Sequence, residues 1–84
     1  MTELSSLERI VLKTLSQAGP LTPLEVAVRS LIHPDSILDA LFSLMDKGFV
    51  YRRERPKGIE RYLYFLSEKG AAAAPEGDYE LDGR

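Results

Sequence analysis

The chain has 84 residues, of which 44% are hydrophobic and 29% charged, with a formal net charge of -2; this composition is typical of one small globular domain. It holds no cysteine and a single histidine, which excludes disulfide bonds, thiolate metal sites and cysteine nucleophiles. No apolar run reaches the roughly 18 residues that cross a bilayer, and the first residues lack the features of a signal peptide, so we expect a cytoplasmic protein without membrane contact.

The sequence predicts a first helix from Ser5 to about Ala18. Ser5 and Glu8 have the spacing of a capping box, in which each side chain accepts a hydrogen bond from the other residue's backbone N–H. Apolar residues then recur at three- and four-residue steps, and Gly19–Pro20 is a typical helix end.

Two further helices are predicted before residue 49. The stretch Thr22–Glu25 repeats the capping signal with proline at the first helical position, and this second helix is expected to run to about Ser30. His33–Ser36 is another cap followed by proline, and Lys47–Gly48 ends the third helix. The residues that this helix is expected to direct inward are Ile37, Leu41 and Leu44.

Strands are predicted after Gly48, because the apolar pattern changes there. Phe49–Tyr51 and Tyr62–Leu66 are rich in aromatic and β-branched residues, and Pro56–Gly58 between them is a turn signal. Two such runs joined by a charged connection predict an antiparallel hairpin with a long loop. The fold class is therefore mainly α, with three helices followed by a small antiparallel β-hairpin.

This order of elements resembles the winged helix-turn-helix domain of bacterial and archaeal transcription regulators of the multidrug-resistance and phenolic-acid repressor types. The resemblance covers residues 5–70 and rests on four stretches, Leu21–Ala27, His33–Ile37, Lys47–Val50 and Leu66–Gly70. It implies a regulator that binds double-stranded DNA, with the third helix approaching the major groove and the hairpin, or wing, lying on the backbone. Since one fold hosts many roles, the function needs its own evidence.

The third helix departs from the DNA-binding pattern of that family. Its apolar residues fill an arc of about 160°, wider than the roughly 100° that one core needs. Its opposite face is acidic, with Asp35, Asp39 and Asp46, which is either an ordinary solvated face or a surface that opposes a polyanion. The excess apolar residues suggest an alternative function, a protein-interaction or dimerisation module without DNA binding, using Leu38, Phe42 and Met45.

Positive charge is concentrated in residues 50–70, which carry six basic and three acidic residues. Any polyanion would meet this segment first. The candidate DNA contacts are Arg52, Arg53, Arg55, Lys57 and Arg61 in the wing and Ser36, Ser43 and Lys47 on the third helix. Because side chains alternate along a strand, Arg53 and Arg55 share one face and Arg52 takes the other. The competing interpretation is an edge hairpin whose charges discourage strand-to-strand aggregation.

Residues 71–84 are predicted to form an acidic, disordered tail after an ordered domain of residues 1–70. Ala71–Ala74 favours a short helical extension, but proline, glycine and acidic residues with little apolar content favour disorder. A second hypothesis has the tail folding back on the basic wing and competing with DNA.

The remaining candidate sites have structural explanations. Tyr51, Tyr62 and Tyr64 suggest stacking platforms for bases, but we favour packing in the core or across the strands. His33 with Asp35 matches no metal site, and a helix cap explains it. With no phosphate loop, serine elbow or carboxylate pair in an apolar run, we expect no enzyme, no cofactor, no metal and no small-molecule site.

Overall fold

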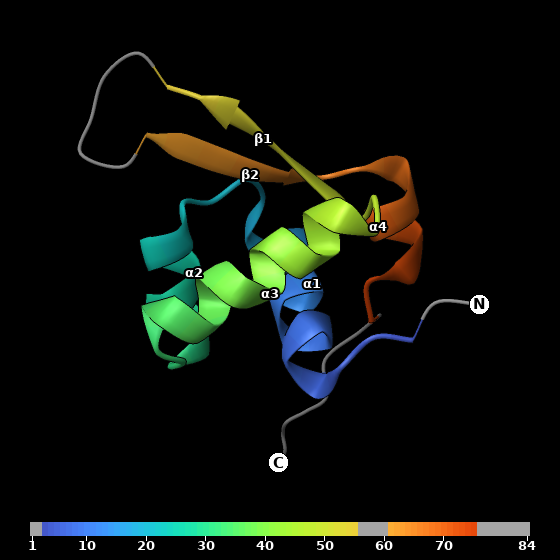
Figure 1. Cartoon of the computed structure of the whole chain (residues 1–84), viewed down its shortest axis with the longest axis horizontal. Coiled ribbons are helices and arrows are strands. Elements are labelled where there is room, and N and C mark those ends of the chain that lie inside the picture. The colour runs from blue at the N-terminus through green and yellow to red at the C-terminus, as the bar shows by residue number, and fades with distance from the viewer. Residues whose placement is uncertain (1–2, 56–60, 76–84) are drawn as a thin grey trace.

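A computed structural model describes residues 3–55 and 61–75 of the chain. In chain order, the elements in these ranges are α1 (Ser6–Ala18), α2 (Pro23–Ser30), α3 (Pro34–Asp46), β1 (Val50–Glu54), β2 (Tyr62–Leu66) and α4 (Glu68–Ala73). The two-stranded hairpin lies across one side of the helices, and α4 packs at its base (Figure 1). This arrangement confirms the predicted winged helix-turn-helix fold.

The helices begin where the capping signals predict. In the first capping box the backbone N–H of Ser5 donates to Glu8 Oε1 at 2.8 Å, and that of Glu8 donates to Ser5 Oγ at 3.1 Å. Thr22 and Glu25 form the same pair of bonds at 2.9 and 3.2 Å. His33 caps α3, because its Nδ1 accepts the backbone N–H of Asp35 at 3.1 Å.

The wing is joined to the helices through Tyr64. β1 and β2 are antiparallel, with Val50 opposite Leu66 and Arg52 opposite Tyr64. Tyr64 also exchanges two backbone hydrogen bonds with Leu21, at 2.8 and 3.2 Å, and its side chain is 1% exposed. Strand β2 therefore sits on the loop that precedes α2, which fixes the wing relative to the helix-turn-helix.

One core lies between the first three helices and the inner face of the hairpin. It includes the inward residues predicted for α3, Ile37, Leu41 and Leu44, each of which is 0% exposed. The other buried apolar residues are Val11, Leu12, Leu15, Leu21, Val26, Ala27, Ala40, Phe49, Val50, Tyr64 and Ala74. No helix in the described ranges combines the length and the apolar character needed to span a bilayer.

The ordered chain continues past the predicted boundary at residue 70, because α4 runs from Glu68 to Ala73 and Ala74 is buried in the core. Ser67 caps this helix: its Oγ accepts the backbone N–H of Gly70 at 3.1 Å and donates to the Gly48 carbonyl at 2.6 Å. These bonds and the helix propensity of alanine outweigh the breaking residues that follow. The rest of the predicted tail, from residue 76, lies outside the described residues.

Candidate nucleic-acid interface

The hairpin register divides the wing arginines between two faces, as predicted. Arg52 lies opposite Tyr64, whose side chain enters the core, whereas Arg53 lies opposite Leu63 on the outer face. Since successive side chains of a strand point to opposite sides, one ligand cannot meet all of these cations on the same face.

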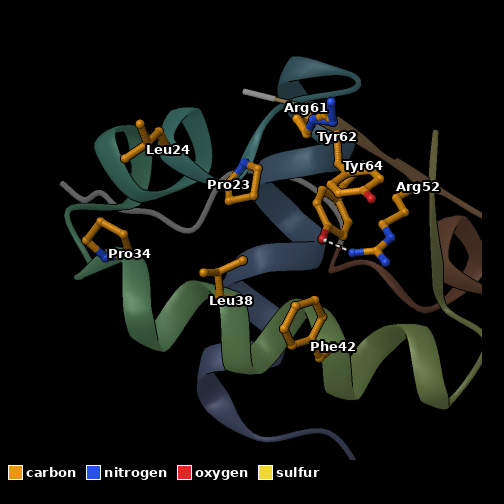
Figure 2. A pocket seen from close by; sticks show the side chains of 9 residues that line it. All are labelled: Pro23, Leu24, Pro34, Leu38, Phe42, Arg52, Arg61, Tyr62 and Tyr64. Atoms are coloured by element: carbon orange, nitrogen blue, oxygen red, sulfur yellow. Dashed lines mark hydrogen bonds between the residues drawn. The ribbon is translucent and has the colours of Figure 1, made fainter. Parts of the chain in front are cut away.

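Arg52 is held on the inner face by two tyrosines. Its guanidinium carbon lies 4.1 Å from the centroid of the Tyr62 ring, and Nη1 donates to Tyr64 Oη at 3.4 Å (Figure 2). The hydrogen bond to Tyr64 raises the pKa of Arg52, so the group is a permanent cation. These contacts direct Arg52 toward a groove beside α3 and away from the outer face of the wing.

The outer face of the wing combines cations with an aromatic stack. The rings of Tyr51 and Phe65 lie 5.2 Å apart and nearly parallel, which confirms cross-strand packing for Tyr51. The guanidinium of Arg53 lies 6.0 and 5.9 Å from these two rings. Arg55 is exposed. Arg61 lines the groove on the inner side of the wing and forms an exposed ion pair with Glu54 at 3.5 Å. Lys57, the fifth predicted wing contact, lies outside the described residues.

The outer surface of α3 is acidic, as its sequence predicts. Asp35, Asp39 and Asp46 are exposed, and Ser36 is exposed beside them. Ala40, between these residues in the sequence, is buried at 5% exposure. The helix therefore presents carboxylates where a major-groove helix usually presents hydrogen-bond donors.

Two of the predicted DNA contacts, Ser43 and Lys47, bind a buried carboxylate of the protein instead. Both hold the carboxylate of Glu8, which is 5% exposed: Ser43 Oγ donates at 2.6 Å, and Lys47 Nζ lies 3.0 and 3.1 Å from its two oxygens. Burial opposes the ionisation of Glu8, but the hydrogen bonds from Ser43, the Ser5 backbone and Lys47 outweigh it and lower its pKa to about 2. Ser43 and Lys47 are therefore already bound to Glu8 within the protein.

An apolar groove of about 420 Å³ separates the start of α2, α3 and the wing (Figure 2). It is lined by Pro23, Leu24, Pro34, Leu38, Phe42, Arg52, Arg61, Tyr62 and Tyr64. Of the three residues predicted to bind a protein partner, Leu38 is half-buried and Phe42 is 47% exposed in this groove. Met45 packs against the core instead, so the predicted patch is smaller than its sequence pattern indicates.

Two features of the structure were missed by sequence reasoning. The first is the cluster of Glu8 with Ser43 and Lys47, which lie 35 and 39 positions further along the chain. In the sequence, the capping box alone is enough to explain Glu8. The second feature is the set of exposed apolar residues in and directly after α2. The sequence could have indicated them, because Leu24, Val28 and Leu31 recur at steps of four and three residues. Within the described residues, no three His, Asp or Glu side chains gather as a metal site.

Comparisons with known proteins agree with this geometry. The family described as sugar-specific transcriptional regulator TrmB matches residues 1–77. An HTH-type transcriptional regulator of Mycobacterium tuberculosis and one of Mycobacterium bovis are each 38% identical over 60 residues, covering 71% of this chain and 42% of those proteins. The chain thus spans less than half the length of these relatives.

Solved winged-helix structures show the same fold. A MarR-family transcription regulator superposes with a TM-score of 0.77 at 22% identity, covering 82% of this chain and 46% of that one. The regulator PcaV of Streptomyces coelicolor, solved with its natural ligand, gives a TM-score of 0.77 at 23% identity over 83% of this chain and 50% of its own.

Proposed function

The chain belongs to the TrmB family of transcriptional regulators, and we propose that its winged helix binds double-stranded DNA mainly through the outer face of the wing. The observation that carries this proposal is the pair Arg53 and Arg55. Both are exposed, and neither lies within ion-pair distance of a carboxylate among the described residues. The charge of Arg55 also acts on the carboxylate of Glu25 in α2, but both guanidinium groups are exposed. Exposed guanidinium groups on a projecting hairpin are suited to phosphate oxygens.

The acidic face of α3 limits how the domain can attract DNA. Three exposed aspartates near a phosphate backbone oppose association, so the attraction has to come from the wing. Ser36 is a neutral hydrogen-bonding residue on the same face that can meet a base edge or a phosphate. We therefore expect salt-sensitive binding, with a Kd on the order of 1 to 100 µM at physiological salt, the range of contacts made chiefly with the backbone.

The double substitution Arg53→Ala plus Arg55→Ala is expected to weaken binding to a mixed-sequence duplex and to flatten its salt dependence. Losing two phosphate contacts reduces the slope of log K against log salt by about 1.8. Fluorescence anisotropy from low to near-physiological salt measures both effects. The matched control is Arg52→Ala, which removes a wing cation that the tyrosines hold on the inner face and should change the slope much less. Equal slopes for the wild type and the double variant would contradict the proposal.

A second candidate function is a protein-interaction module at the groove between α3 and the wing. The observation that favours it is Phe42, a large aromatic residue left 47% exposed on an apolar surface. The same anisotropy experiment separates the two functions. A chain that binds no duplex even at low salt would contradict the first function, and Phe42→Ser is the variant that tests the second by loss of partner binding.

A further inference from the structure

The outer face of the hairpin carries two aromatic side chains and is left open by the described helices. Helices α1, α2 and α3 lie on one side of the two strands, where Tyr64 enters the core (Figure 1). On the other side Tyr51 lies opposite Phe65, and Arg53 follows opposite Leu63. An exposed aromatic pair on an open sheet face is a candidate contact surface.

Packing across the strands uses only part of the Tyr51 ring. The ring centroids of Tyr51 and Phe65 lie 5.2 Å apart with 9° between their planes, so each ring covers part of one face of the other. Tyr51 nevertheless remains 42% exposed. We call Tyr51 and Phe65 the aromatic pair. Because the two rings already hold each other parallel without a ligand, they form a flat surface on which another planar ring can stack.

The cation beside the aromatic pair is placed to meet a phosphate. The guanidinium carbon of Arg53 lies 6.0 Å from the centroid of Tyr51 and 5.9 Å from that of Phe65. Arg55, just beyond the end of β1, is also exposed. In a nucleotide a single sugar joins the base to its phosphate, so a base on the aromatic pair would bring a phosphate to Arg53. Aromatic rings beside exposed cations are the combination that binds single-stranded nucleic acid.

Stacking on the aromatic pair requires an unpaired strand. In a duplex both faces of each base are covered by its neighbours, and a side chain reaches a face only where the stack is opened at a cost in free energy. A single strand offers its base faces directly. It also stays away from the exposed aspartates of α3, since that helix lies on the other side of the hairpin.

We propose that the outer face of the wing binds single-stranded DNA, with bases stacked on the aromatic pair and phosphates held by Arg53 and Arg55. Such binding is tolerant of sequence, because every base has a face that can stack, and it weakens as salt is raised. The inference goes beyond the proposed duplex binding. It shares the two arginines with that function but not the aromatic pair, so either can fail without the other.

The first test compares Tyr51→Leu with Tyr51→Phe at low salt. Fluorescence anisotropy follows binding to a labelled oligothymidylate of about 12 nucleotides, a length within the usual site size, and to a mixed-sequence duplex. Leucine keeps the charge but removes the ring, so affinity for the single strand should fall at least about fivefold while affinity for the duplex changes less than about twofold. Phenylalanine keeps the ring and should bind the single strand as the wild type does.

Circular dichroism checks that Tyr51→Leu remains folded. A wild type that binds no oligothymidylate at low salt, or a folded leucine variant that binds it as tightly as the wild type, would overturn the proposal. Loss of duplex binding alone would contradict the proposed function and leave this inference standing. An oligouridylate of the same length that binds more tightly than the oligothymidylate would overturn the assignment to DNA.

The second test observes Tyr51 directly and needs no variant that loses the ring. A base stacked on a tyrosine quenches its fluorescence, so the oligothymidylate should reduce the emission of the wild type more than that of Tyr51→Phe. The chain has four tyrosines, and the difference between these two proteins isolates the contribution of Tyr51. An equal loss of emission in both proteins at saturation would show that no base stacks on Tyr51.

Discussion

Glu8→Gln is expected to lower the free energy of unfolding by about 2 to 3 kcal/mol at neutral pH, because it removes the charge that the buried cluster with Ser43 and Lys47 stabilises. The pKa of Glu8 falls from 4.5 to about 2 in the folded protein, which corresponds to about 3 kcal/mol at 1.36 kcal/mol per unit. The expected loss of unfolding free energy is somewhat smaller, because the Lys47 side chain is 30% exposed and solvent partly screens its charge. Glutamine retains the capping box, so the loss reports the cluster.

The effect of Glu8→Gln should disappear in acid. A carboxyl group whose pKa is lowered by folding stabilises the protein fully above its unfolded value near 4.5, and this contribution is lost as the pH falls toward 2. Urea unfolding at pH 7, 4 and 2 should therefore show a difference between wild type and variant that shrinks toward zero. Glu3→Gln is the matched control, because Lys47 contacts only the backbone carbonyl of Glu3. A difference that is unchanged at pH 2 would contradict the assigned cluster.

Gly70→Ala is expected to destabilise the domain by about 3 kcal/mol or more. A Cβ on Gly70 would overlap the carbonyl of Phe49, a backbone group that also accepts the N–H of Ser67 at 3.0 Å. Backbone atoms cannot give way as a flexible side chain does, so α4 would have to move off the turn before β1.

Thermal unfolding of Gly70→Ala beside Ala72→Gly measures this effect. Ala72 is exposed on the same short helix, so its replacement costs at most about 1 kcal/mol of helix propensity. Equal melting temperatures for the two variants would show that the close approach of α4 to Phe49 does not require glycine at position 70.

The parts of the fold that the sequence predicted are those set by local chemistry. The capping boxes at Ser5 and Thr22, the His33 cap and the change of apolar period at residue 49 involve residues within a few positions of one another. The second half of α4, residues 71–73, was assigned to a tail because the local signals conflict. Its position depends on Ser67 and Gly70 meeting the distant Gly48–Phe49 turn.

The candidate interface was also predicted only in part, because some of its properties are local and others depend on residues far apart in the sequence. Strand alternation placed Arg53 and Arg52 on opposite faces, because that property depends only on the register of neighbouring residues. The helical projection placed Ser43 and Lys47 near the outer face of α3, but it could not show that α1 brings Glu8 to them. A polar residue on a helix surface is available to a ligand only if no other element reaches it, which is a tertiary property.

DNA binding by the wing is tested most directly by titrating the uniformly ¹⁵N-labelled chain with a short mixed-sequence duplex at low salt and following the backbone amide shifts. We expect the shifts to concentrate on residues 53–55, with smaller ones at the exposed start of α3, and to reverse when salt is raised. An absence of shifts, or shifts confined to α1 and α4, would contradict a wing that carries the DNA-binding surface.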